Sequence, residues 1–134
     1  MKHFSIIKTI FFLSVLSFIS CTKEDSPSPT TTPRKIRFVL YTEEDFSNDN
    51  DNITFSLVIR NSTKTLFDSS LSTMKVKDIP KPADKLVFEK QVPNDDGSVL
   101  TAGFYYTIEN VGISWYLDTC SVGQSFKVIN YSFK

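Results

Sequence analysis

Residues 53–61 read ITFSLVIRN, and the alternation of apolar and polar side chains in this segment decides the fold class. The apolar side chains that share one face are Ile53, Phe55, Leu57 and Ile59. Thr54, Ser56 and Arg60 fall on the other face, because successive side chains of a β-strand point to opposite sides of the sheet. The segment is therefore predicted to be a β-strand with one buried face.

The same alternation appears on both sides of this segment. Residues 35–42 place Ile36, Phe38 and Leu40 on one face, which predicts a second half-buried strand. Further strands are predicted over residues 65–69, 74–79, 85–92, 99–110, 113–119 and 126–133. No segment shows a sustained helical repeat with caps, so the chain is predicted to be all-β. Seven to eight short strands favour a two-sheet antiparallel β-sandwich of immunoglobulin-like or transthyretin-like form.

One hairpin register can be predicted from the alternation. A two-residue turn at 111–112 would pair Tyr106 with Leu117 and Ile108 with Trp115, which gathers the apolar side chains of both strands on one face. A slip of one residue would mix apolar and polar side chains on each face. The pattern therefore favours this register.

The same register places Tyr105 and Tyr116 diagonally across the outward face of the hairpin. Exposed aromatic side chains can stack on sugar rings, so these two residues are candidates for ligand binding. The simpler interpretation is that the pair stabilises the hairpin or is covered by the second sheet.

The first 20 residues have the features of an export signal. Lys2 and Lys8 give the beginning of the chain positive charge, and residues 10–19 form an apolar stretch. That stretch is too short for a spanning helix, which needs about 20 apolar residues. Residues 1–20 are therefore predicted to be a signal peptide.

Residues 17–21, SFISC, resemble a lipobox, the cleavage site of bacterial lipoprotein signal peptidase. Ser20 is the small residue that precedes the cysteine, and Phe18 stands where leucine is usual. The resemblance implies cleavage after Ser20 and acylation of the Cys21 thiol, with palmitate among the acyl chains. An ordinary secretory signal that happens to contain a cysteine is the alternative, in which Cys21 has only Cys120 as a disulfide partner.

The residues that follow Cys21 resemble the export signal of surface lipoproteins of Bacteroidota, a lysine followed by acidic residues: Lys23, Glu24 and Asp25. Residues 26–33, SPSPTTTP, are typical of a semi-extended spacer. We therefore expect a lipidated N-terminus and linker over residues 21–34 and a β-sandwich domain over residues 35–134. As a whole the chain is similar to small surface lipoproteins of Bacteroidota, which implies a lipid anchor in the bacterial outer membrane and display at the cell surface.

Charge and histidine content exclude several functions. The chain has 15 basic and 15 acidic residues, and loss of Lys2 and Lys8 with the signal peptide leaves a net charge of −2. Nucleic-acid binding is excluded, because it needs clustered basic residues to displace counterions from phosphates. The only histidine, His3, is also lost, so serine and cysteine triads lack their general base and catalytic zinc lacks its usual ligands. Cys120 is predicted to be a packed residue and not a nucleophile.

Residues 43–52, EEDFSNDNDN, are the one candidate metal site. Asp45, Asp49 and Asp51 offer carboxylate oxygens, which calcium prefers. The segment has no glycine at the turn position of an EF-hand, and a solvated loop rich in turn-forming residues explains it more simply. No cofactor is expected, and calcium stays an alternative.

These observations predict a non-enzymatic binding or assembly module, held to the membrane by its lipid anchor, with a surface protein or a glycan as partner. Two alternatives stay open. One is a calcium-dependent module for membrane or protein binding that resembles C2 domains. The other is a carboxylate-based hydrolase, since a pair of carboxylates is enough for glycoside hydrolysis.

Overall fold

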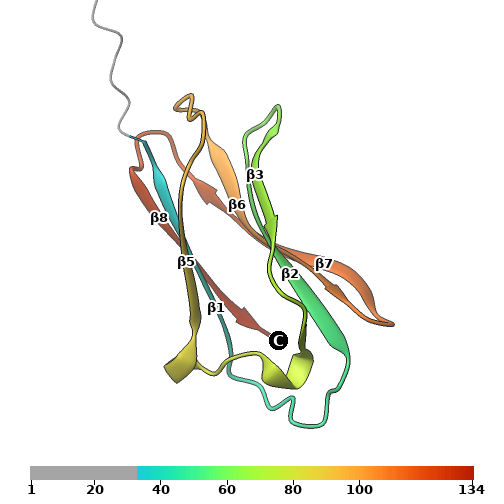
Figure 1. The fold of residues 1–134 in the computed structure, drawn as a ribbon. Helices are drawn as coiled ribbons and strands as arrows, with labels where there is room; N and C mark the ends of the chain where they lie inside the picture. Colours follow the sequence, from blue (N-terminus) through green and yellow to red (C-terminus); the bar gives the residue numbers. More distant parts are fainter. Residues whose placement is uncertain (1–32) are drawn as a thin grey trace, which may run out of the picture. The chain divides into compact units, whose positions relative to one another are not determined.

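Residues 33–134 are the part of the chain that the structure, a computed structural model, describes, and their strands form two facing sheets (Figure 1). One sheet has three strands in the order β5–β1–β8, and the other has β3–β2–β6–β7 with β4 paired to β2. The strands are β1 (Lys35–Thr42), β2 (Asn52–Arg60), β3 (Thr65–Ser70), β4 (Met74–Lys75), β5 (Leu86–Gln91), β6 (Leu100–Ile108), β7 (Gly112–Cys120) and β8 (Phe126–Phe133). Two short 3₁₀ helices, η2 (Val76–Asp78) and η3 (Pro82–Asp84), precede β5. The predicted all-β sandwich is confirmed.

The core lies between the two sheets and consists of the apolar faces that the alternation predicts. On β1 and β2 the fully buried side chains are Ile36, Phe38, Leu40, Ile53, Phe55 and Ile59. Phe104 of β6 joins the two layers, because its ring meets Phe38 and Phe55 edge-on at centroid distances of 5.7 and 6.2 Å. Burying each such side chain stabilises the fold by about 1.5–3 kcal/mol relative to leaving it exposed.

The sandwich is not antiparallel throughout. Strands β1 and β8 run parallel along their whole length, from the pair Lys35 and Phe126 to the pair Thr42 and Phe133. A hydrogen bond of 2.8 Å from Thr42 Oγ1 to the Phe133 carbonyl closes the end of this pairing. Hairpin connections force neighbouring strands to be antiparallel, but these two strands are joined through the whole other sheet, so no turn constrains their direction. The prediction of a purely antiparallel sandwich is wrong at this point.

The predicted strand over residues 74–79 is mostly a turn. Only Met74 and Lys75 pair with β2, and the chain then forms η2. Val76 and Ile79 are both buried, and the Ile79 amide donates to the Val76 carbonyl. A spacing of three residues places two side chains on the same side of a 3₁₀ turn. The apolar residues that suggested a strand therefore anchor a turn in the core.

The predicted register of the β6–β7 hairpin is also wrong. In the structure Ile108 pairs with Gly112 and Tyr105 pairs with Trp115, across a loop of three residues, 109–111. Asn110 has φ 64° and Gly112 has φ 126°, conformations that asparagine and glycine tolerate best. The register is shifted by three residues from the predicted one, and an odd shift turns each side chain of β7 to the other face.

Candidate functional site

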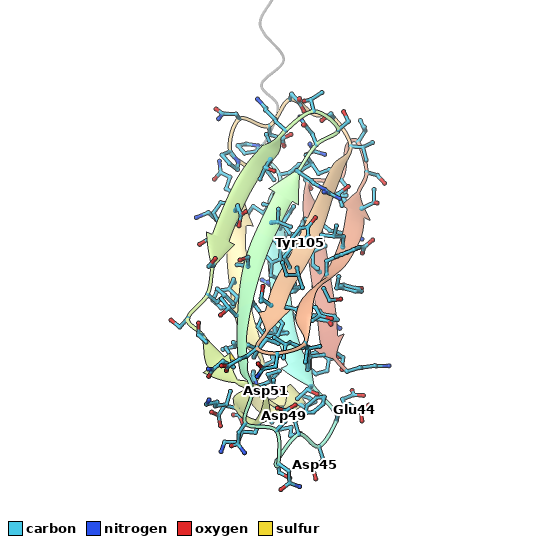
Figure 2. All side chains as sticks on the ribbon, turned by 90° about the vertical axis from the view of Figure 1, so that its right-hand side faces the viewer. Glu44, Asp45, Asp49, Asp51 and Tyr105 are labelled. Atoms are coloured by element: carbon cyan, nitrogen blue, oxygen red, sulfur yellow. The ribbon has the colours of Figure 1, made fainter. Side chains whose placement is uncertain are left out.

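The outward surface of the five-stranded sheet carries mostly hydroxyl, aromatic and aliphatic side chains. We call this surface the outer face. It consists of Thr54, Ser56, Val58, Arg60, Asp68, Ser70, Thr101, Gly103, Tyr105, Thr107, Ile113, Trp115, Leu117 and Thr119, which share one side in the strand registers. Its charged members are Arg60 and Asp68, and Lys75 and Glu109 continue the same side next to Asn52, at the beginning of β2. Figure 2 shows this sheet toward the viewer, with Tyr105 near the middle of it.

An aromatic pair lies on the outer face. Tyr105 of β6 and Trp115 of β7 are direct neighbours in the register, with ring centroids 6.3 Å apart and ring planes inclined by 42°. Trp115 is 62% exposed and its neighbour in β7 on the same face, Ile113, is 71% exposed. Contiguous apolar surface of this kind is uncommon on soluble domains and often marks a binding site.

Tyr105 is held in place by Arg60. Its hydroxyl accepts a hydrogen bond of 3.2 Å from Nη1 of Arg60, which pairs with Thr101. Gly103 lies between Thr101 and Tyr105 on the same face of β6. A Cβ atom at Gly103 would lie 2.0 Å from the Tyr116 carbonyl oxygen, so this position requires glycine. At this point the backbone of β7 therefore approaches β6 closely.

Tyr116 does not belong to the outer face. Its ring points the other way and stacks on Tyr131 of β8, with centroids 4.7 Å apart and planes inclined by 12°. Tyr131 donates a hydrogen bond of 3.1 Å to the hydroxyl of Tyr106, and burial raises the pKa of Tyr131. Tyr116 therefore closes the side of the sandwich between β7 and β8. The predicted pairing of Tyr105 with Tyr116 is wrong, because the three-residue turn reverses the faces of β7.

Sequence reasoning missed both Trp115 and Arg60 as members of a candidate site. It placed Trp115 among the core residues, because the register was built on a two-residue turn. The useful signal is Asn110, a residue type that adopts a left-handed conformation more readily than its neighbours and so favours a turn centred on residue 110.

The acidic loop between β1 and β2 does not gather the predicted calcium ligands. Asp45 Oδ1 accepts from the Ser47 amide and Asp49 Oδ1 accepts from the Asp51 amide, each at 3.0 Å. The first of these bonds lowers the pKa of Asp45. In Figure 2 Asp49 and Asp51 lie close together at the end of the sheet, whereas Asp45 lies at the far tip of the loop. Among residues 33–134 no three His, Cys, Asp or Glu side chains are placed to hold a metal ion.

Two lysines also occupy oxygen atoms of this loop. Lys77 Nζ donates to Asn50 Oδ1 at 2.7 Å, and Lys81 Nζ donates to the Glu44 carbonyl at 2.5 Å. A calcium ion needs 6 to 8 oxygens and would have to displace these ammonium groups. The described geometry therefore favours the interpretation of residues 43–52 as a solvated loop.

Calcium is expected to leave the stability of the protein unchanged. A soluble chain that begins at residue 22 should keep the same melting temperature in millimolar calcium and in EDTA. A site filled at a hundredfold excess over its Kd would add about 2.7 kcal/mol, which raises the melting temperature of a domain of this size by several degrees. A rise that disappears in the double variant Asp49→Asn, Asp51→Asn would contradict this expectation.

A buried ion pair lies at the other end of the sandwich, next to Cys120. Arg34 donates to Asp95 through Nε at 2.7 Å and through Nη2 at 2.5 Å, and the two side chains are only 4% and 6% exposed. These hydrogen bonds, opposed by desolvation, lower the pKa of Asp95 to about 2. Cys120 is fully buried, as predicted, and burial raises the pKa of its thiol. A protonated, inaccessible thiol is a packing residue and not a nucleophile.

Comparisons with known protein families, with curated proteins and with solved structures give no significant match to this chain. Over residues 33–134 there is no helix with the length and apolar character needed to cross a membrane. The predictions for Cys21, Lys23, Glu24 and Asp25 lie outside the described residues.

Proposed function

We propose that this chain is a lipid-anchored surface protein whose β-sandwich is a non-enzymatic binding module, with the outer face as its binding surface. The observation that carries the proposal is Trp115, a large aromatic side chain that is 62% exposed beside Tyr105 on a sheet face. Tryptophan and tyrosine are the residues most enriched at the energetic centres of interfaces. The two side chains lie on the surface and contribute little to the packing of the core, so ligand binding accounts for their position.

The anchor follows from the sequence of the first 34 residues. Acyl chains on Cys21 would each contribute about 0.8 kcal/mol per buried CH₂ group, so two or three chains hold a protein stably on a membrane. The spacer between Cys21 and β1 is rich in proline, serine and threonine, and an extended chain of this kind spans about 3.1 Å per residue. It would hold the domain about 40 Å from the bilayer at full extension.

The alternative functions have less support. A calcium-dependent module would need the carboxylates of residues 43–52 to converge, and the described loop holds Asp45 and Asp49 in local turns. A carboxylate hydrolase needs two acids facing one cleft, whereas the carboxylates on this side of the sheet, Asp68 and Glu109, lie beside Val58 and Asn52, six residues apart along β2. The mature chain also lacks an imidazole, since its only histidine is His3.

Lipidation is tested by metabolic labelling of cells with an alkynyl fatty acid. We expect label on the wild-type protein and none on Cys21→Ala, because Cys21 supplies the only acylated thiol. The matched control is Cys120→Ala, which removes the other cysteine and should keep the label. Label that persists in Cys21→Ala would show that this cysteine is not the anchor.

The same strain set tests display at the cell surface. Protease treatment of intact cells should degrade the wild-type domain and spare a variant with alanine at Lys23, Glu24 and Asp25. Both proteins should carry the lipid label, so a difference reports on export and not on acylation. Equal degradation of the two proteins would contradict the predicted export signal.

A further inference from the structure

We infer that the outer face binds a neutral glycan chain, with Trp115 and Tyr105 as the surface on which sugar rings stack. This inference rests on the proposed function and names its ligand class. The contributing features are the aromatic pair, the hydroxyl groups around it, and a shallow depression that continues from Arg60.

The aromatic pair is suited to sugar rings because one of its members is already ordered. The Arg60 guanidinium holds the Tyr105 hydroxyl by a hydrogen bond. A ligand that stacks on this ring does not have to immobilise it, which lowers the entropic cost of binding. Trp115 stands beside it, inclined by 42°, so the two rings form an angled aromatic platform. The C–H faces of pyranose rings pack well on such surfaces.

The neighbouring side chains match a ligand with many hydroxyl groups and no charge. Thr54 and Thr73 share a hydrogen bond of 2.7 Å between their hydroxyl oxygens, and Ser56 and Ser70 share one of 2.9 Å. Each hydroxyl keeps further capacity to accept or donate. The charged groups on this side of the sheet are two of each sign, Arg60 and Lys75 against Asp68 and Glu109. A strongly anionic or cationic ligand would find no complementary field here.

A shallow depression extends the outer face beyond Arg60. Arg60 and Thr101 belong to both surfaces, and the remaining lining residues are Asn61, Ser62, Lys64, Thr65 and Val99. Arg60 donates to Tyr105 with one of its five N–H groups, which leaves others for this depression. Aromatic stacking at one end and hydrogen-bonding groups at the other form a linear track, and a linear track fits a chain of sugars better than a single small molecule.

A second protein chain is the competing occupant. Strand β7 is an edge strand of its sheet, and edge strands can pair with another chain. Such pairing would engage the backbone edge of β7 and would make little use of Arg60, Tyr105 or the hydroxyl rows of β2 and β6. The location of the ordered side chains away from the edge favours the glycan.

Trp115 is the only tryptophan in the chain, so its fluorescence reports on the proposed site alone. The soluble chain from residue 22 would be titrated with three neutral polysaccharides, a β-glucan, a mannan and a xylan, and with heparin as an anionic control. We expect a saturable blue shift of the emission with at least one neutral polysaccharide and none with heparin, because stacking removes water from the indole. A flat response to all three neutral polysaccharides would overturn the inference.

Variants are compared by retardation in gels that contain the same polysaccharide. Trp115→Ala should weaken binding about tenfold or more, as expected for a central aromatic contact, and Arg60→Met should weaken it less by releasing Tyr105. Tyr116→Phe, on the other side of the same strand, is the matched control and should bind like the wild type. Unchanged melting temperatures would show that the variants fold. Equal retardation of Trp115→Ala and wild type would overturn the inference.

Sedimentation at increasing protein concentration separates this inference from the proposed function. Self-association that depends on Trp115, without glycan binding, would overturn the inference that the ligand is a glycan. It would keep the proposal that the outer face is a binding surface. A face that binds neither glycan nor a second copy would count against both. Lipid labelling at Cys21 tests the anchor independently of either result.

Discussion

Gly103→Ala is expected to lower the free energy of unfolding by about 3 kcal/mol or more, in the upper part of the range for overpacked sites. The new Cβ would lie 2.0 Å from the Tyr116 carbonyl oxygen and 2.9 Å from the Leu117 Cα. Both atoms belong to the backbone of β7, so the clash cannot be relieved by a rotamer change. It must separate β6 from β7 locally or bend one of them. Chemical denaturation of the soluble protein would measure the loss.

Gly97→Ala is the matched control for this substitution. Gly97 has φ 76°, and a Cβ there would meet no atom within 4 Å. Alanine at that position costs only the energy of its left-handed backbone conformation, roughly 1–2 kcal/mol. If Gly103→Ala destabilises the protein no more than Gly97→Ala does, the close approach of β6 and β7 is not as tight as described.

Asp95→Asn is expected to destabilise the protein by about 3–5 kcal/mol at neutral pH, the usual cost of removing one partner of a buried ion pair. The Arg34 guanidinium would stay buried without a counter-charge, since its side chain is only 4% exposed. The control is Glu89→Gln, which breaks the pair with Arg37 on the outside of β1 and β5. Those side chains are 44% and 46% exposed, so the expected loss is about 1 kcal/mol or less.

The same pair predicts a pH dependence. The pKa of Asp95 is about 2 in the folded protein against an ordinary value of 3.8. A carboxyl group whose pKa is lower in the folded state stabilises the protein at pH values above its unfolded-state pKa. This stabilisation is lost as the pH falls through the folded-state pKa. The stability difference between wild type and Asp95→Asn should therefore be constant above pH 5 and shrink by roughly 2 kcal/mol between about pH 4 and pH 2. A difference that does not change with pH would contradict the assignment.

Local patterns predicted the strands well where a strand has one buried face. The ends of β1 and β8 agree with the predicted ranges 35–42 and 126–133. The segment 74–79 misled the prediction, since apolar residues that anchor a turn look like a short strand. The alternation of apolar and polar residues indicates which side chains are buried. It does not distinguish a strand from a turn that packs on the core.

Features that depend on pairing between distant residues or on unusual backbone conformations could not be predicted from the sequence. The parallel pairing of β1 with β8 joins the two ends of the folded domain, and no short-range pattern encodes it. The register of β6 and β7 depended on a single turn residue, Asn110, and an error of three residues exchanged the environments of Trp115 and Tyr116. The geometry of the acidic loop, residues 43–52, was also out of reach. Amino-acid composition does not show whether carboxylates converge on one point or accept hydrogen bonds from nearby backbone amides.

The pairing of β1 has a mechanical consequence for the proposed lipid-anchored protein, in which the domain would be held by an N-terminal tether. Tension along that tether enters the fold at β1, which is bonded on one side to β5 and on the other to β8. Because β1 is pulled along its own length, its hydrogen bonds to β5 and β8 are loaded in shear and must break together. In a hairpin that is pulled apart at its open end, the hydrogen bonds break one at a time. Arg34 and Asp95, at the point of entry, take the load first. In the proposed role, a domain built this way would resist unfolding under flow while a ligand is bound elsewhere on the sandwich.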